Sequence, residues 1–166
     1  MRGAHPDATA PLRLVGHRTA SRFPGPARMR VTDAQQGLVH VRDFTRRTLA
    51  AWESGACGDE AVLVVNELAT NALLHAASKV PVERREVWLK LSLRRAHLVC
   101  AVTDPYDRPP VHLPADVAQD DHGRGLGIVD ALSEHWGWTR FPAGKIVWAM
   151  LRTPCPPDGT EAWGPT

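Results

Sequence analysis

One segment near the middle of the chain constrains the fold and the chemistry more than any other. It runs from Val64 to Ala76 and reads VVNELATNALLHA. On a helix of 3.6 residues per turn, the apolar residues in and just before this segment gather on one side. That stripe consists of Val62, Val65, Ala69, Ala72, Leu73 and Ala76. We therefore expect a helix over residues 59–77 whose apolar stripe packs on a core.

The opposite side of this helix carries Glu67 and Asn71, four residues apart, with His75 one turn further on. A carboxylate and a carboxamide stacked in this way suit a metal–phosphate site, with the amide oxygen as a hard ligand and the carboxylate as a base. The same three residues also fit an ordinary solvated polar face. The helix alone does not separate these two interpretations, so the rest of the chain has to decide.

Composition excludes several classes of protein. With 166 residues the chain is long enough for one domain with tails, and 43% hydrophobic and 23% charged residues are ordinary for a globular protein. A net charge of +2 is too small to argue for nucleic acid or an acidic membrane as a partner. No apolar run approaches the ~20 residues of a membrane span, and the N-terminus lacks the apolar core of a signal peptide. We therefore expect a cytoplasmic protein that binds neither a membrane nor nucleic acid.

The cysteines support the same compartment. Cys57, Cys100 and Cys155 are far apart and form no Cys-x-x-Cys pair. This spacing argues against a zinc site and against a disulfide framework, and it suits a reducing environment.

Periodicity along the chain predicts helices on one face of a sheet. Apolar residues at helical spacing predict a first helix over 33–52 with Thr32 or Asp33 as its N-cap, and a short edge strand is expected before Phe23. Two antiparallel hairpins follow from alternating or apolar runs, with a helix between them. The hairpin strands are residues 86–93 with 97–104, and 136–141 with 145–151; the helix between them is 128–135. This order predicts an α+β fold, an α/β sandwich with a mostly antiparallel sheet.

Three stretches differ from this core in composition. Residues 1–22 show no periodicity and are expected to form a flexible arm, and residues 153–166 form a Pro- and Gly-rich tail. The domain is therefore expected to span 23–152. Within it, the long Pro-rich stretch from Pro105 to about residue 122 is the kind of loop that is usually functional.

Two further patches carry candidate site residues. Asp104 ends an apolar strand, where an aspartate either forms a turn with its own backbone or accepts a hydrogen bond from the amine of a purine. Gly123, Gly125 and Gly127 precede the predicted third helix and would expose free N–H groups to phosphate oxygens, although such a run also fits a plain hinge. The run lacks the preceding strand and the spacing of a dinucleotide-binding fingerprint, and no Walker phosphate loop is present.

Together these motifs resemble a known family. The run Glu67–Ala76 (ELATNALLHA) is similar to the asparagine box of the GHKL ATPases, the gyrase, heat-shock chaperone, histidine kinase and mismatch-repair type. Residues 102–110 (VTDPYDRPP) resemble a degenerate first glycine box, and residues 123–138 (GRGLGIVDALSEHWGW) resemble the second. With Phe23-Pro24-Gly25 near the start and residues 144–148 (GKIVW) near the end, the likeness is closest to the stand-alone anti-sigma-factor serine kinases and their actinobacterial relatives. It covers residues 23–152.

The resemblance implies a histidine-kinase-like ATPase fold of the Bergerat type and a set of roles. Asn71 would hold Mg²⁺ that bridges the phosphates of ATP, and Glu67 would act as the general base or orient the attacking hydroxyl. Asp104 would bind the adenine amine. The remaining candidates would contact the phosphates or line the lid over residues 106–124; they are His75, Gly123, Arg124, Gly125, Leu126, Gly127 and Lys145. Of these, Lys145 also fits a hairpin-end lysine without any partner.

By resemblance, the protein would be an ATP-dependent serine/threonine protein kinase that binds a sigma factor and phosphorylates an anti-sigma antagonist protein, and it would form a homodimer. One departure supports an alternative. The first glycine box usually has a small residue two positions after its aspartate and a glycine beyond, where this chain has Tyr106 and Arg108. The alternative is therefore a catalytically weak or inactive ATP-binding regulator that works by protein–protein contact alone.

Overall fold

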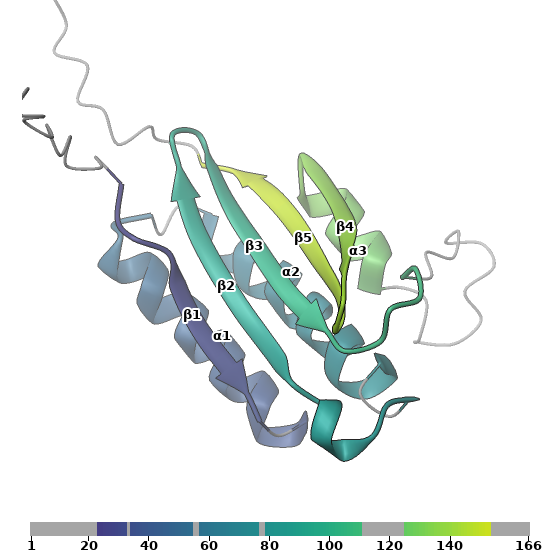
Figure 1. Ribbon diagram of the computed structural model, residues 1–166. Coiled ribbons are helices and arrows are strands. Elements are labelled where there is room, and N and C mark those ends of the chain that lie inside the picture. Colours follow the sequence, from purple (N-terminus) through teal and green to yellow (C-terminus); the bar gives the residue numbers. More distant parts are fainter. Residues whose placement is uncertain (1–22, 33, 55–56, 77–78, 111–124, 154–166) are drawn as a thin grey trace, which may run out of the picture.

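The structure, a computed structural model, describes residues 23–32, 34–54, 57–76, 79–110 and 125–153 of the chain. These residues form a five-stranded antiparallel sheet with three α-helices on one of its faces (Figure 1), which confirms the predicted α+β class. The elements, in chain order, are β1 (Ala27–Val31), α1 (Ala34–Ala51), α2 (Gly58–Thr70), the π-helical turn η2 (Asn71–Ala76), the 3₁₀ turn η4 (Val82–Arg84), β2 (Val87–Arg94), β3 (His97–Asp104), α3 (Gly125–Leu132), β4 (His135–Phe141) and β5 (Gly144–Arg152).

The sheet has the strand order β1-β2-β3-β5-β4, so the two predicted hairpins meet where β3 pairs with β5. Along both of these strands every second side chain is buried, as expected when one face of an antiparallel sheet lies on the core. In their register Asp104, the last residue of β3, lies directly opposite Lys145 near the start of β5. The central pairing thus brings together two of the candidate site residues.

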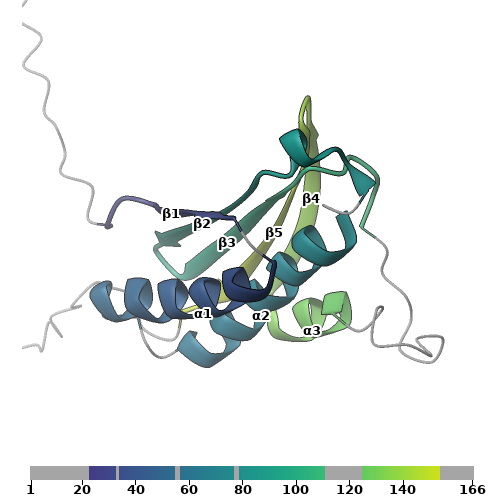
Figure 2. The same cartoon turned by 90° about the horizontal axis from the view of Figure 1, so that it is seen from below.

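Helix α2 is the centre of the helical layer, which covers one face of the sheet (Figure 2). Its buried side is wider than the predicted stripe, because Val64 and Leu68 are also buried. The expected polar side is present as well, since Glu67 and Asn71 are only partly buried. The sequence therefore predicted the orientation of this helix correctly.

The helix changes its winding at Asn71. The N–H of Asn71 donates to the carbonyls of both Glu67 and Leu68, and the next turn, η2, is π-helical. The predicted helix over 59–77 did not foresee this change. Short π-helical segments within helices are frequent at functional sites, because the wider turn re-aims side chains.

Three boundaries differ from the sequence predictions. The strand expected before Phe23 would lie outside the described residues; instead β1 follows the Phe23–Pro26 segment and pairs with β2. Helix α3 begins at Gly125, three residues earlier than predicted, and ends at Leu132, so that residue 135 already belongs to β4. The predicted N-cap Asp33, the arm 1–22, most of the lid and the tail from 154 lie outside the described part, and the domain limits stay a prediction.

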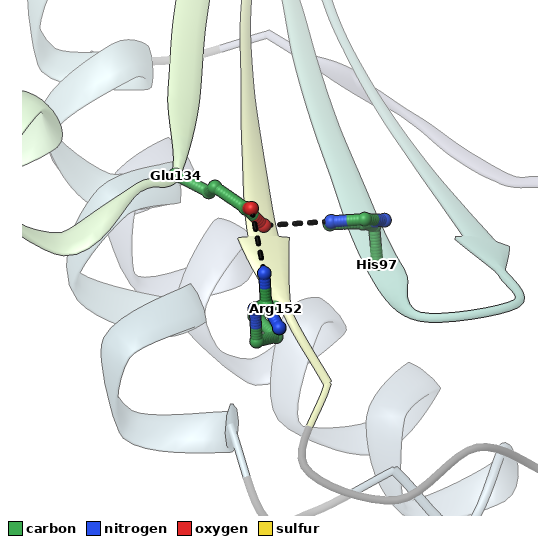
Figure 3. A network of polar contacts seen from close by, with 3 residues as sticks. All are labelled: His97, Glu134 and Arg152. Atoms are coloured by element: carbon green, nitrogen blue, oxygen red, sulfur yellow. Dashed lines mark hydrogen bonds and ion pairs between the residues drawn. The ribbon is translucent and has the colours of Figure 1, made fainter.

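A polar network fastens the chain after α3 to the sheet (Figure 3). Glu134 contacts His97 Nε2 at 2.7 Å and Arg152 Nη2 at 2.8 Å, so it joins the start of β3 to the end of β5. Hydrogen bonds from Arg152 and His97 lower the pKa of Glu134 to about 2. This network fixes the C-terminal end of α3, whose first residue belongs to the candidate site.

None of the described helices is long and apolar enough to cross a membrane.

Candidate functional site

The structure brings Gly125, at the start of α3, against Glu67 and Asn71 on the polar side of α2. A Cβ placed on Gly125 would lie 2.7 Å from Glu67 Oε2 and 3.6 Å from Asn71 Oδ1. A contact of 2.7 Å is closer than real Cβ atoms approach, so only glycine fits here without moving the carboxylate. Segments more than fifty residues apart in the sequence therefore meet at one point, which we call the phosphate end of the site.

The first turn of α3 supplies N–H groups to this point. The first N–H groups of a helix have no partner within the helix and attract anions. The prediction that Gly125 and Gly127 form a loop ahead of the helix is wrong, because both lie inside its first turn. Leu126 is buried at 4% exposure, so only its backbone is available to a ligand. A Cβ at Gly127 would have no other atom within 4 Å, in contrast to one at Gly125.

Glu67 has the properties of a usable base. Partial burial raises the pKa of its carboxyl above the usual 4.5, while a hydrogen bond from the Asn66 side chain lowers that pKa. A carboxylate with a raised pKa takes up a proton more readily. Asn66 was not predicted as a site residue, and its Oδ1 is buried without a hydrogen-bond partner in the part of the chain that the structure describes.

The residues at the phosphate end fit a hard divalent cation such as Mg²⁺. Glu67 and Asn71 offer carboxylate and amide oxygens, the ligands that Mg²⁺ prefers beside phosphate oxygens and water. Because Gly125 has no Cβ, the first turn of α3 can approach both side chains closely. Among the described residues there is no group of three or more His, Cys, Asp or Glu side chains that would hold a metal by itself. The donor set therefore suits an ion bound together with a phosphate.

Asp104 marks a second point, the base end of the site. Its carboxylate is buried and forms an ion pair with Lys145, with 2.8 Å between Oδ2 and Nζ. The N–H of Tyr106 donates to Oδ1 at 2.8 Å, and Lys145 also donates to the Tyr106 carbonyl at 2.6 Å. Burial raises the pKa of Asp104, and its contacts with Lys145 and Tyr106 offset part of that rise. The interpretation of Lys145 as a hairpin-end lysine without a partner is wrong.

Tyr106 sits between two cations at the base end. Its ring centroid lies 5.1 Å from Lys79 Nζ and 5.7 Å from Lys145 Nζ, which are cation–π distances. Both lysines thus hold the ring beside Asp104. Tyr106, the aromatic residue that departs from the family pattern, is therefore held by contacts within the base end.

Gly144 allows β5 to approach the base end closely. A Cβ at this position would overlap the carbonyl oxygen of Asp104, and its φ of 149° is one that side-chain-bearing residues rarely adopt. The glycine places the following residue, Lys145, against Asp104. Nothing in the spacing of the turn Pro142-Ala143-Gly144 predicted this role.

Three predicted site residues cannot be placed. Gly123 and Arg124 lie outside the described residues, and of His75 only the backbone in η2 is described. The residues that the structure does bring together are Glu67, Asn71 and Gly125 at one end, and Asp104 with Lys145 at the other. The turn η2 packs on β3, which links the two ends.

The domain carries a carboxylate on one helix, α2, and a carboxamide at the end of that helix, and these groups face a second helix, α3, that begins with glycine. This arrangement defines a candidate nucleotide site. The chain belongs to the family of histidine kinase-like ATPase domains, whose sequence model matches residues 31–151. This confirms the resemblance to the GHKL ATPases and makes the chain an ATP-binding, nucleotide-binding protein. A comparison with curated proteins found no match.

Proposed function

We propose that this protein is a Mg-ATP-dependent serine/threonine protein kinase that acts as a cytoplasmic anti-sigma factor and phosphorylates an anti-sigma antagonist protein. The observation that carries the proposal is the contact of Gly125 with Glu67 and Asn71. A site that only held a nucleotide would have no need to keep an accessible carboxylate with a raised pKa beside the phosphate end.

The residues of the phosphate end have separate tasks in this proposal. Asn71 and water would hold Mg²⁺, which neutralises phosphate charge when it is bound. The N–H groups at the start of α3 bind phosphate oxygens. Glu67 accepts the proton of the seryl hydroxyl as that oxygen attacks, and Asn66 holds the carboxylate in place. Phosphoryl transfer asks for positioning and charge neutralisation more than for covalent chemistry, so this short set of groups is sufficient.

Transfer of labelled phosphate tests this proposal. Purified protein is incubated with [γ-³²P]ATP, Mg²⁺ and an extract of its own cells, and labelled proteins are mapped by mass spectrometry. We expect one acceptor protein to gain phosphoserine or phosphothreonine with the wild type and none with Glu67→Gln, although that variant still binds nucleotide. Equal labelling by both proteins would reject Glu67 as the base, and no labelling by the wild type would reject the kinase.

A specific observation supports a second function. Asp104 already bonds to Lys145 and Tyr106, and the Tyr106 ring stands beside it, so the base end is occupied by the chain's own groups. A protein with such a base end would bind ATP weakly and regulate a partner by contact alone. Nucleotide binding without transfer, in the experiment above, is the outcome that this alternative predicts.

The partners follow from the same family likeness. A sigma factor would be held by contact and the antagonist protein would be the substrate, with no membrane and no nucleic acid involved. A homodimer is the proposed assembly. Sedimentation of the purified protein would test the dimer directly.

A further inference from the structure

The sheet face opposite the α-helices, which we call the outer face, has no described α-helix over it, and only the short 3₁₀ turn η4 lies at one of its ends (Figure 2). Antiparallel sheets with one open face normally alternate apolar residues inward with polar residues outward. Here the outward positions of β5 are Ile146, Trp148 and Met150, all partly exposed, and Trp88 on β2 is 41% exposed. An apolar surface on an otherwise ordinary domain points to an interaction site.

The tryptophan at the centre of the outer face spreads over its neighbouring strand. Gly137 on β4 lies opposite Trp148 on β5. A Cβ at Gly137 would lie 2.8 Å from Trp148 Cζ2, so the indole lies across β4 in the space that the glycine leaves. The apolar surface is therefore continuous from β5 onto β4.

Positive charge borders this apolar surface on the side of β1 and β2. Arg28 lies directly opposite Lys90 in the register of these strands. Like charges in this position destabilise a strand pair, and neither residue has a carboxylate partner among the described residues. Its neighbour Arg30, by contrast, pairs with Glu86 at 2.9 Å. The chain thus keeps two opposed cations uncompensated next to exposed tryptophan.

The outer face ends in a hollow of about 380 Å³ between the start of β2 and the turn that joins β4 to β5. Trp88, Thr103, Phe141 and Ala143 line it from the strands and their turn, and η4 borders it through Glu83 and Arg84. Glu86 completes the lining, and its charge is matched by Arg30 at 2.9 Å. Interfaces typically anchor an aromatic or large apolar side chain in such a pocket. Trp88 and Lys90 share one face of β2 and lie about 7 Å apart along the strand.

We propose that the outer face is a docking surface for an acidic, extended segment of another protein. An apolar or aromatic side chain of the segment enters the hollow against Trp88 and Phe141. A carboxylate two positions away meets Lys90 and Arg28, and further apolar side chains cover Trp148 and Ile146. A second copy of the chain fits less well, since it would bring its own Arg28 and Lys90 to the surface and add to the positive charge there. Nucleic acid fits less well, because its backbone needs cations along its whole length, whereas Glu83 and Glu86 line the hollow at the end of this face.

Fluorescence anisotropy of a labelled peptide tests the proposal on the full-length protein without nucleotide. The probe is a short synthetic peptide that alternates glutamate with leucine and carries one central phenylalanine. We expect saturable binding that weakens with added salt and falls about tenfold or more in the double variant Arg28→Glu, Lys90→Glu. Trp88→Ala should also weaken it, because that change removes a wall of the hollow.

A matched control separates local from overall charge. The double variant Arg42→Glu, Arg46→Glu makes the same change of net charge on exposed positions of α1, and it should bind the peptide like the wild type. Circular dichroism verifies that all variants fold. Peptides with lysine in place of glutamate, or serine in place of the apolar residues, should not bind.

Four outcomes would overturn the proposal. The first is that the wild type does not bind the acidic peptide, and the second is that the α1 control loses binding equally. The third is that a single-stranded oligonucleotide binds more tightly than the peptide. The fourth is that the wild type is a dimer which the double variant Arg28→Glu, Lys90→Glu dissociates. None of them depends on ATP, so the result is independent of the proposed kinase function.

Discussion

The two ends of the candidate site differ in what their side chains already bind. At the phosphate end, the partly exposed side chains of Glu67 and Asn71 face a glycine, and neither forms an ion pair with a described residue. At the base end, Asp104 is buried, paired with Lys145 and bonded to the N–H of Tyr106. In the proposed function the first end would receive a phosphate and a cation, whereas the second already has partners within the chain.

This contrast separates the groups that would handle phosphate from the groups that would read the base. The groups that would handle phosphate come from α2 and α3, which pack on each other. The groups that would read the base come from the ends of β3 and β5, where one lysine and one tyrosine change the acceptor properties of the aspartate. Each end can therefore be perturbed without the other.

We expect a substitution at the base end to have the largest effect, and that effect is on stability. Lys145→Met leaves the Asp104 carboxyl buried without its cation, which should lower the free energy of unfolding by about 3–5 kcal/mol. Burial raises the pKa of Asp104 and Lys145 lowers it, so without Lys145 that pKa is higher still and the folded variant takes up a proton more readily than the wild type. The loss should therefore be smaller in acid and grow as the pH rises. Urea denaturation at several pH values measures it.

Removing both partners is the control for this prediction. The double variant Lys145→Met, Asp104→Leu has no buried charge and should recover most of the stability that the single variant loses. A single variant as stable as the wild type would show that the pair contributes nothing, and the contrast between the two ends would be lost.

The next effect is on catalysis at the phosphate end. Gly125→Ala places a methyl group 2.7 Å from Glu67 Oε2 and must displace the carboxylate. A misplacement of about 1 Å is enough for a hundredfold fall in the rate of phosphoryl transfer. Single-turnover transfer to the identified acceptor measures it. Gly127→Ala, which meets nothing within 4 Å, should transfer at the wild-type rate; equal rates for both variants would contradict the assigned contact.

A weaker effect distinguishes two roles of Tyr106. If the ring occupies the place of the base, Tyr106→Ala should raise the affinity for a non-hydrolysable ATP analogue about tenfold, the scale of the cation–π contacts that are removed. Tyr106→Phe keeps the ring and should bind like the wild type. A weaker affinity in Tyr106→Ala would instead mean that the ring stacks on the base. Calorimetric titration gives both values.

The weakest effect concerns the far end of α3. The pKa of Glu134 is about 2, below its usual 4.5, so its contribution to stability is present above pH 4.5 and is lost as the pH falls toward 2. Glu134→Gln should therefore be less stable than the wild type at pH 7, and the two proteins should converge near pH 2. A difference that stays constant with pH would show that the network with His97 and Arg152 is not electrostatic.

The sequence predicted those parts of the fold and site that rest on periodicity and short spacing. The polar side of α2 and the two hairpins follow from patterns within a dozen residues, and the structure shows them where they were expected. The strand β1 was missed because it has only five residues and directly follows the proline-rich segment Phe23–Pro26. The start of α3 was placed too late, because glycine is a poor helix former and tertiary packing overrides that preference.

The contacts of the base end could not be predicted, because they depend on the register between two strands about forty residues apart. Only that register places Lys145 opposite Asp104, and only the close approach of Gly144 makes the ion pair possible. The Tyr106 ring was recognised as a departure, yet its position between Lys79 and Lys145 required the fold. Sequence patterns identify chemistry on one element; they do not show which elements meet.

Nucleotide binding at the phosphate end can be measured by calorimetric titration of the wild type and Asn71→Ala with a non-hydrolysable ATP analogue and Mg²⁺. We predict saturable binding by the wild type and a clear weakening in Asn71→Ala that is seen with Mg²⁺ and disappears without it. Folded wild-type protein that binds no nucleotide, or an Asn71→Ala variant that binds as tightly as the wild type with Mg²⁺, would contradict the assignment of the phosphate end.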